Sequence, residues 1–312
     1  MSDFVHLPPY RVDFVLAPHS ASDGVDWAVA GYGIPGLWKQ TAGEGVRVAV
    51  VDSGVAPHVA LTGVVVDWRN FSSDPEVYDT LGHGTHVAGI IGAKTGLAKG
   101  IAPGCSIISM KVLGHSGMGS MDAVAHAVTH SVEAKCDIVC MSLGSPRANS
   151  QVHDAIRHAT NHGVIVVCAA GNDGGSVNYP AAFSETIGVG AVDKDGNVCE
   201  FSSRGKEITV AAPGRDITST WLDNGYATIS GTSMAAPFVA GVLCLYVSAA
   251  KKDGQKISHS SVLKALEDTC RDVNAPGRCD DYGWGLMDPH KLLSFAAPPA
   301  GVTIYIPGAK IL

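Results

Sequence analysis

The stretch VRVAVVD at residues 46–52 is a run of small and β-branched apolar residues that ends on an acid. An unbroken apolar run of this length is typical of a strand that is covered on both faces of a sheet. Similar runs follow it at residues 106–113, 137–144, 164–171, 186–193 and 208–214. Helical patterns lie at residues 85–93, 120–135, 150–162, 233–250 and 259–269. The alternation predicts an α/β fold with three layers: a doubly wound, mostly parallel sheet with helices on both faces.

Between residues 21 and 296 the sequence shows no linker and no internal repeat, so we expect one domain there. The two ends differ from it in character. Residues 1–20 form an N-terminal extension that contains LPPY, and residues 297–312 form a C-terminal tail that contains VTIYI. We expect VTIYI to be an edge strand on its own sheet. A strand exchanged between two copies of the chain, and hence a homodimer, is the alternative.

The composition excludes some classes of function. The chain has a formal net charge of −7 and no basic stripe, which argues against nucleic acid as a partner. No unbroken apolar run reaches about 18 residues, the length that spans a membrane, and the first residues lack a secretory signal, so we expect a cytoplasmic protein without a membrane span. The eight cysteines include no CxxC motif and are expected to be reduced thiols. Cys270 and Cys279 could bridge under oxidation.

Polar residues stand at strand ends and helix starts, where an open parallel sheet places its functional crevice. Asp52 ends the first strand, and Asn172 follows the strand VIVVCAAG. His83 opens a helix in LGHGTHVAG, and Ser233 opens another in SGTSMAAPF. Each residue alone has an ordinary structural interpretation, as a turn cap or a hydrogen-bonding group. Together they supply a nucleophile, a base, an acid that orients the base and an amide donor.

The chemistry of nucleophilic catalysis explains why these residue types belong together. A serine hydroxyl becomes a nucleophile when a base such as histidine takes its proton, and a carboxylate fixes the tautomer of that histidine. The start of a helix offers free N–H groups where an oxyanion develops, and Asn172 can donate a second hydrogen bond. We expect Pro237 to cost little because N–H groups of the first helical turn have no partner.

The segments VVDSGV, GHGTHVAGIIGA, MSLG, AAGN and SGTSMAAPFVAG resemble the signature segments of the subtilisin-like serine proteases, and the resemblance covers nearly the whole chain. It implies that Asp52 orients His83, that His83 is the general base and then the acid, and that Ser233 attacks the peptide carbonyl. It assigns the oxyanion to Asn172 and requires no cofactor for the chemistry.

The same resemblance implies where a protein or peptide substrate binds. Two edge segments would hold an extended substrate by main-chain pairing, and their residues are Ser142, Leu143 and Gly144 in one and Gly117 and Gly119 in the other. Gly171 lies beside the oxyanion donor. Asn178 occupies the base of the pocket that binds the residue before the cleaved bond. Glycine is frequent at this position in the family. We expect this pocket to be shallow and to prefer hydrophobic or medium-sized residues.

The stretch HLPPYRVDF resembles the N-terminal extension of the intracellular subtilisins. In that group the extension lies over the active site and blocks it until it is removed. The matching residues are Leu7, Pro8, Pro9 and Tyr10. The two prolines stiffen the segment, remove two N–H donors and can hold a peptide bond out of line with Ser233. A leader without any role is the alternative.

The chain departs from the family pattern at a calcium ligand, and two other functions compete with the protease interpretation. The family often holds calcium with an aspartate where this chain has Ala60, so a structural calcium ion would need carbonyls and Asp193 or Asp195. A catalytically silent, peptide-binding relative is the first rival. The second is a dinucleotide-binding protein based on GYGIPG at residues 31–36, but Pro35 and the glycines after it break the helix that should follow.

Overall fold

The computed structural model describes residues 4–16, 23–273 and 276–296. Its centre is a seven-stranded sheet in the order β10-β9-β8-β7-β3-β5-β4, and all neighbouring strands run parallel. The strands are β3 (Arg47–Asp52), β4 (Val65–Asn70), β5 (Ser106–Lys111), β7 (Ile138–Met141), β8 (Ile165–Ala169), β9 (Ile187–Val192) and β10 (Ile208–Pro213). The winding reverses at β3, and the crevice at such a switch point is where open α/β sheets bind ligands. Asp52 is the last residue of this strand.

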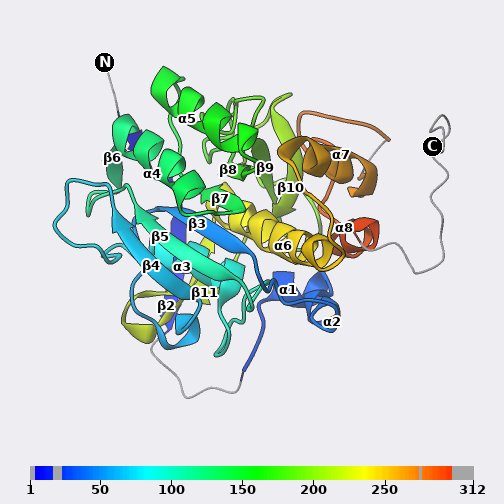
Figure 1. Ribbon diagram of the computed structural model, residues 1–312, viewed down its shortest axis with the longest axis horizontal. Coiled ribbons are helices and arrows are strands. Elements are labelled where there is room, and N and C mark those ends of the chain that lie inside the picture. The colour runs from blue at the N-terminus through cyan, green and yellow to red at the C-terminus, as the bar shows by residue number, and fades with distance from the viewer. Residues whose placement is uncertain (1–3, 17–22, 274–275, 297–312) are drawn as a thin grey trace.

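Helices cover both faces of the sheet, as Figure 1 shows. On one face lie α4 (Met121–Glu133) and α5 (Ser150–Asn161), and on the other lie α3 (His83–Gly92), α6 (Thr232–Lys252), α7 (His259–Thr269) and α8 (Pro289–Ala296). The side chains of β3 alternate between the two cores: Val48 and Val50 belong to one, and Ala49 and Val51 to the other. This is why the strand is apolar throughout, and the three-layer fold predicted from it is confirmed.

The helix α6 is the centre of the larger core. It is long and apolar enough to cross a membrane by length and composition, although its unbroken apolar runs are shorter than about 18 residues, and its apolar window is wholly buried inside the protein. Its packing against β7, β8, β9 and α3 accounts for that composition. Ser233 is its second residue and therefore lies at the end of the helix that meets the sheet crevice.

Short elements outside the sheet were not predicted. β1 (Phe4–His6) pairs antiparallel with β6 (Met118–Ser120). β2 (Arg11–Leu16) pairs with β12 (Tyr226–Ser230), which pairs in turn with β11 (Ile217–Thr220). The segment GYGIPG lies across two short helices, α1 (Trp27–Gly31) and α2 (Ile34–Leu37), rather than between a strand and a long helix. The strand expected in residues 297–312 lies outside the described residues.

All eight cysteines are free thiols, including Cys270 and Cys279. Six of them are buried. Burial raises the pKa of the Cys136 and Cys270 thiols to about 12, which disfavours the reactive thiolate at neutral pH. The six buried cysteines are therefore small core residues, and Cys168 and Cys244 among them lie within apolar runs of the sequence.

Candidate active site

Asp52 and His83 meet where β3 ends and α3 begins. Their side chains are fully buried, and Nδ1 of His83 lies 2.8 Å from Oδ1 of Asp52. The approach requires Gly84, because a Cβ at this residue would collide with the carbonyl oxygen of Gly54. The N–H of Ser53 donates to the same Asp52 oxygen at 2.7 Å. Asp52 is thus held in place to fix the orientation of the imidazole.

A second buried carboxylate, Asp79, fixes the start of α3 and was missed by the sequence analysis. It accepts hydrogen bonds from the Ser53 hydroxyl at 2.9 Å and from the N–H and hydroxyl of Thr85 at 2.9 and 2.7 Å. Burial raises the pKa of the Asp79 carboxyl, and the bonds from Thr85 oppose that rise. The sequence feature that could have identified Asp79 is an acidic residue shortly before the start of a helix, because such residues cap the free N–H groups of the first turn.

The motif LGHGTHVAG contains two histidines, and their surroundings differ. His86 is fully buried, with Nε2 3.1 and 3.0 Å from the carbonyl oxygens of Ile217 and Ala227. Burial lowers the pKa of His86 to about 3, so its imidazole stays neutral and donates to a carbonyl. His86 therefore ties α3 to the β11–β12 hairpin, and only His83 is paired with a carboxylate.

Ser233 is joined to a predicted substrate-binding segment by two reciprocal hydrogen bonds. The Ser233 hydroxyl donates to the carbonyl of Ser142 at 3.3 Å, and the Ser142 hydroxyl donates to the carbonyl of Ser233 at 2.9 Å. Pro237 explains why that second acceptor is free. The helix starts at Thr232, so Pro237 lies beyond the first turn, and its missing N–H would have bonded the carbonyl four residues earlier. The expectation that Pro237 uses a vacant first-turn position was wrong.

Asn172 follows β8 and contacts the residue next to Ser233. Its Oδ1 accepts hydrogen bonds from the N–H and the hydroxyl of Thr232, at 2.8 and 2.7 Å. Because Oδ1 is engaged in this way, Nδ2 is the group turned toward the cleft. Nδ2 donates to the carbonyl of Pro9 at 2.8 Å. The side chain is therefore oriented as a donor to a carbonyl oxygen in the cleft.

The N-terminal extension lies between the two predicted substrate-binding segments. Val5 is opposite Gly119 in the β1–β6 ladder, and the N–H of Leu7 donates to the carbonyl of Gly117 at 3.1 Å. On the other side, His6 and Gly144 exchange hydrogen bonds of 3.2 and 3.0 Å. The extension thus pairs by its main chain with both segments, as an extended peptide does in strand addition.

The extension then covers the candidate catalytic groups. The ring of Tyr10 lies 5.1 Å from the ring of His83, centre to centre, and Pro9 is the residue held by Asn172. Among the described residues, Nε2 of His83 has no hydrogen-bond partner. The nucleophile and the base are therefore both in place but are not joined while the extension is present.

Asn178 lies against two of the glycines predicted to bind substrate, Gly144 and Gly171. A Cβ at Gly171 would collide with its amide nitrogen, and a Cβ at Gly144 would lie 3.3 Å from its Cβ. The side chain therefore packs against both glycines, Gly144 in one predicted substrate-binding segment and Gly171 beside Asn172. Gly171 has φ +119°, a conformation that favours glycine. Asn178 occupies space that a glycine at this position would leave open.

Asp193 and Asp195, the residues named for calcium, are engaged by other protein groups in this structure. The Asp193 carboxylate accepts the N–H groups of Asp195 and Asn197, both at 2.9 Å, and Asp195 pairs with Lys194 at 3.1 Å. Ala60 is buried in the core. Within residues 4–16, 23–273 and 276–296, no group of three His, Cys, Asp or Glu side chains could hold a metal ion. Calcium also binds carbonyl oxygens, so a structural calcium ion held mainly by carbonyls stays a prediction. We therefore derive no step through a metal ion.

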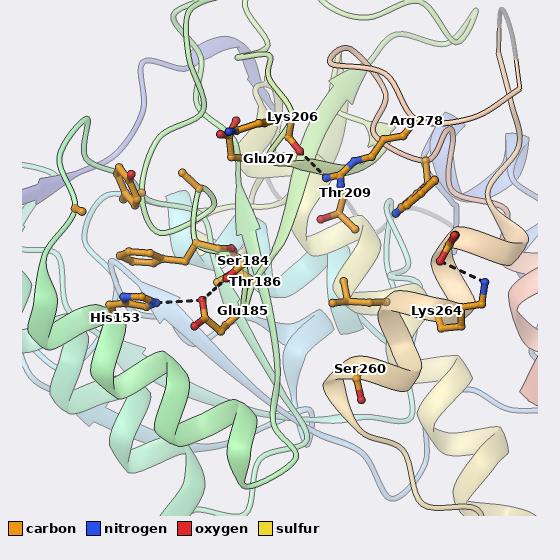
Figure 2. Close-up of a pocket in the computed structure, with 17 residues that line it drawn as sticks. His153, Ser184, Glu185, Thr186, Lys206, Glu207, Thr209, Ser260, Lys264 and Arg278 are labelled. Carbon is orange, nitrogen blue, oxygen red and sulfur yellow. Dashed lines mark hydrogen bonds and ion pairs between the residues drawn. The ribbon is translucent and has the colours of Figure 1, made fainter.

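Another cavity lies away from these groups. It measures about 890 Å³, and Figure 2 shows its lining, which includes none of the four candidate catalytic residues. Several of its charged groups are paired: His153 with Glu185 at 3.1 Å, Lys264 with Asp268 at 2.7 Å, and Arg278 with the carbonyls of Lys206 and Ile208. The candidate catalytic residues are therefore not part of this cavity.

Comparison with known proteins identifies the family of the chain. The sequence model of the subtilase family matches residues 43–285. An intracellular serine protease of Paenibacillus polymyxa is 40% identical over 256 residues, which cover 77% of each chain. The major intracellular serine protease of Bacillus subtilis is 39% identical over 249 residues, covering 74% of this chain and 78% of the relative.

A third relative shows that the similarity extends to a secreted enzyme. The minor extracellular protease Epr of Bacillus subtilis is 36% identical over 278 residues, covering 85% of this chain and 42% of the relative. The family match spans the seven strands of the central sheet, the helices α3 to α7 and all four candidate catalytic residues. The family expected from the sequence motifs is confirmed: this chain belongs to the subtilase family and is a subtilisin-like serine endopeptidase.

Proposed function

We propose that this chain hydrolyses peptide bonds in proteins through Asp52, His83 and Ser233, with Asn172 as an oxyanion donor. The observation that carries the proposal is the path of the chain's own extension. It pairs by main chain with both walls of the cleft, and its Pro9 carbonyl accepts a hydrogen bond from Asn172 beside Ser233. A substrate held in the same way would place its carbonyl between a nucleophile and a donor.

The catalytic steps follow from these positions. Asp52 holds the proton of His83 on Nδ1, which leaves Nε2 free to accept a proton. As the Ser233 oxygen attacks the peptide carbonyl carbon, Nε2 takes the hydroxyl proton, and Asn172 Nδ2 stabilises the oxyanion. The protonated His83 then gives its proton to the leaving amine as the C–N bond breaks. Water attacks the acyl ester by the same route, releases the acid and restores Ser233.

We further propose that the chain is made as a precursor blocked by residues 1–20, with Leu7, Pro8, Pro9 and Tyr10 over the site. Main-chain pairing holds the extension in the cleft, and Tyr10 covers the imidazole. The open arrangement of Ser233 and His83 fits a blocked state. The partners of the site are then protein or peptide substrates and the extension itself.

A cytoplasmic location is part of the proposal. Two of the relatives are named intracellular serine proteases, although a third is named extracellular.

The formal net charge of −7 fits a protein without nucleic acid as a partner. Homodimer formation through VTIYI stays a prediction, since it lies on residues outside those the structure describes.

Replacing Asn172 tests the proposed function at its oxyanion donor. In Asn172→Ala we expect kcat for peptide hydrolysis to fall about 10²–10³-fold with KM nearly unchanged, the magnitude known for an asparagine donor in subtilisin, a member of this family. We expect kcat to fall without a matching change in KM because the Asn172 amide binds the oxyanion of the transition state more strongly than it binds the carbonyl of the bound substrate. Steady-state kinetics on one quenched peptide measure both constants. An unchanged kcat would remove Asn172 from the mechanism.

Asn178 is the proposed determinant of the residue before the cleaved bond. In Asn178→Gly we expect kcat/KM for peptides with Phe or Tyr at this position to rise at least about 10-fold, because removing the amide opens room for a large side chain. Peptides with Ala should change less than about twofold. A panel of quenched peptides that differ only at this residue provides the measurement. Equal gains for Ala and Phe would show that Asn178 acts on folding or on the extension instead.

A further inference from the structure

Three charged side chains are buried together behind the Asp52–His83 pair. Among the Asp, Glu, Lys and Arg side chains that the structure describes, only Asp52, Asp79 and Lys111 are buried, with exposed fractions of 0%, 4% and 0%. Lys111 ends β5 and lies opposite Asp52, the last residue of β3, in the parallel ladder. Buried charges are tolerated when opposite charges and hydrogen bonds compensate them. The one buried ammonium of this part of the chain therefore lies beside its two buried carboxylates.

The Lys111 ammonium binds the main chain next to each of these carboxylates. Its Nζ donates to the carbonyl of Ser53 at 3.1 Å and to the carbonyl of Tyr78 at 3.2 Å. Ser53 follows Asp52 in the chain, and Tyr78 precedes Asp79. Because an ammonium has three N–H donors in one compact group, a single lysine can join both segments. Lys111 thus ties together the two segments that carry the buried acids.

Ser53 transmits this restraint to the catalytic pair, because each of its polar groups is engaged. Its N–H donates to the Asp52 carboxylate at 2.7 Å, and its hydroxyl donates to Asp79 at 2.9 Å. The hydroxyl oxygen also accepts the N–H of Gly84 at 3.0 Å, at the start of α3. The remaining group, the carbonyl, accepts from Lys111. Without the ammonium, Ser53 loses a restraint, and its N–H is held less firmly against Asp52.

The same ammonium also faces a surface carboxylate. Oδ2 of Asp74 lies 3.8 Å from Nζ of Lys111. Asp74 accepts the N–H of His115 at 2.7 Å, and its other oxygen lies 3.1 Å from Nδ1 of that histidine. The contact with the His115 ring, together with the nearby ammonium, holds the pKa of the Asp74 carboxyl below its ordinary value. His115 lies two residues before Gly117, so Lys111 is also connected to a predicted substrate-binding segment.

We propose that Lys111 is a positioning residue for the Asp52–His83 pair. The inference rests on the proposed function and adds to it a residue that acts through others. The ammonium balances two buried carboxylates and holds the segments that carry them, which keeps Asp52 aligned with Nδ1 of His83. Alignment of this kind affects the chemical step, since a misplacement of about 1 Å can cost about 10²-fold in rate.

Two neutral variants of the full chain test the proposal by kinetics. Lys111→Met keeps the length of the side chain and removes its charge and its donors. Lys111→Gln also lacks the charge but can still donate a hydrogen bond, which makes it the more tolerant variant for folding. Immobilised wild type removes the extension from each and is then filtered out. On one quenched peptide we expect kcat to fall about 10–100-fold and KM to change less than about twofold.

A spectroscopic measurement reports on the pair itself and needs no activity. In Ser233→Ala, the proton on Nδ1 of His83 is bound to the Asp52 carboxylate and should give a proton NMR line far downfield of the amide protons. We expect Lys111→Met or Lys111→Gln in this background to shift or broaden that line, because the carboxylate is no longer held in one orientation.

Lys251→Met is the matched control. Lys251 also donates to a carbonyl, that of Gly45 at 2.9 Å, and also pairs with an aspartate, Asp137 at 2.7 Å. It lies near the end of α6, about 27 Å along the helix from Ser233. This variant should keep the kcat, the KM and the NMR line of its parent. Thermal unfolding of every variant shows whether the domain is folded.

The outcomes separate positioning from other roles. Wild-type kcat in a folded neutral variant, or an unchanged NMR line, overturns the inference. A rise in KM alone also overturns it, because Lys111 would then act through Asp74 on the substrate-binding segment. If neither neutral variant folds, Lys111 supports the whole domain, and the inference is again overturned. No Ser233-dependent hydrolysis by wild type overturns the proposed function, and the NMR line then decides separately whether Lys111 orients the pair.

Discussion

Ser233→Ala abolishes peptide hydrolysis and leaves the extension uncut. We expect a loss of at least about 10⁵-fold in kcat, since removing the nucleophile serine of subtilisin, a member of this family, costs about 2 × 10⁶-fold. The Ser233 hydroxyl touches only the Ser142 carbonyl in the described structure, so the fold should tolerate alanine. Hydrolysis of a quenched peptide gives the rate, and intact-mass spectrometry over hours shows whether residues 1–20 are lost.

The matched control is Ser294→Ala, which removes an exposed serine on α8, far along the chain from the cleft. It should hydrolyse peptides and lose its extension at the wild-type rate. Wild-type hydrolysis that survives in Ser233→Ala would point to another nucleophile or to a contaminating protease. If neither the wild type nor the control hydrolyses any peptide, even after deletion of residues 1–20, the chain is the catalytically silent relative instead.

The layers of the fold could be predicted because the strands are buried on both faces. β3, β5, β7, β8, β9 and β10 all read as mostly apolar runs, and each observed strand lies within its predicted range. β4 was missed because Val66 and the end of the strand are exposed at the sheet edge. β2 was missed for a related reason: its pairing depends on the main chain of β12, and the exposed side chains of Phe14 and Val15 carry no periodic signal.

The candidate catalytic residues could be named from the sequence because each lies at a strand end or helix start, next to glycine or small residues. What could not be predicted is how residues distant in the chain support them. The reciprocal bonds between Ser142 and Ser233 join positions 91 residues apart. The Ser233 carbonyl is free to accept a hydrogen bond only because Pro237 has no N–H. A proline inside a helix predicts that one carbonyl lacks its helical partner, but the local sequence does not indicate which distant group will donate to that carbonyl.

Val5→Asp should release the block. The Val5 side chain is 1% exposed and packs in the core cluster that contains Leu143 and Met121, so a carboxylate there would be buried without a partner. Such a charge costs about 3–5 kcal/mol, far more than a three-residue strand can offset. We expect the initial rate of peptide hydrolysis by freshly purified chain to rise at least about 100-fold over wild type, without the lag that processing of the wild type would cause.

Phe4→Asp is the matched control, because Phe4 is the neighbouring residue on the same strand but is 51% exposed. A charge at this position faces water and should change the initial rate less than about twofold. Thermal unfolding of both variants shows whether the catalytic domain is intact. If Val5→Asp is as slow as wild type while its domain is folded, the extension is held by β2 and not by β1. If wild type and both variants are fully active from the first minute, the extension does not block the site, and its contacts with Asn172 and His83 have no inhibitory role.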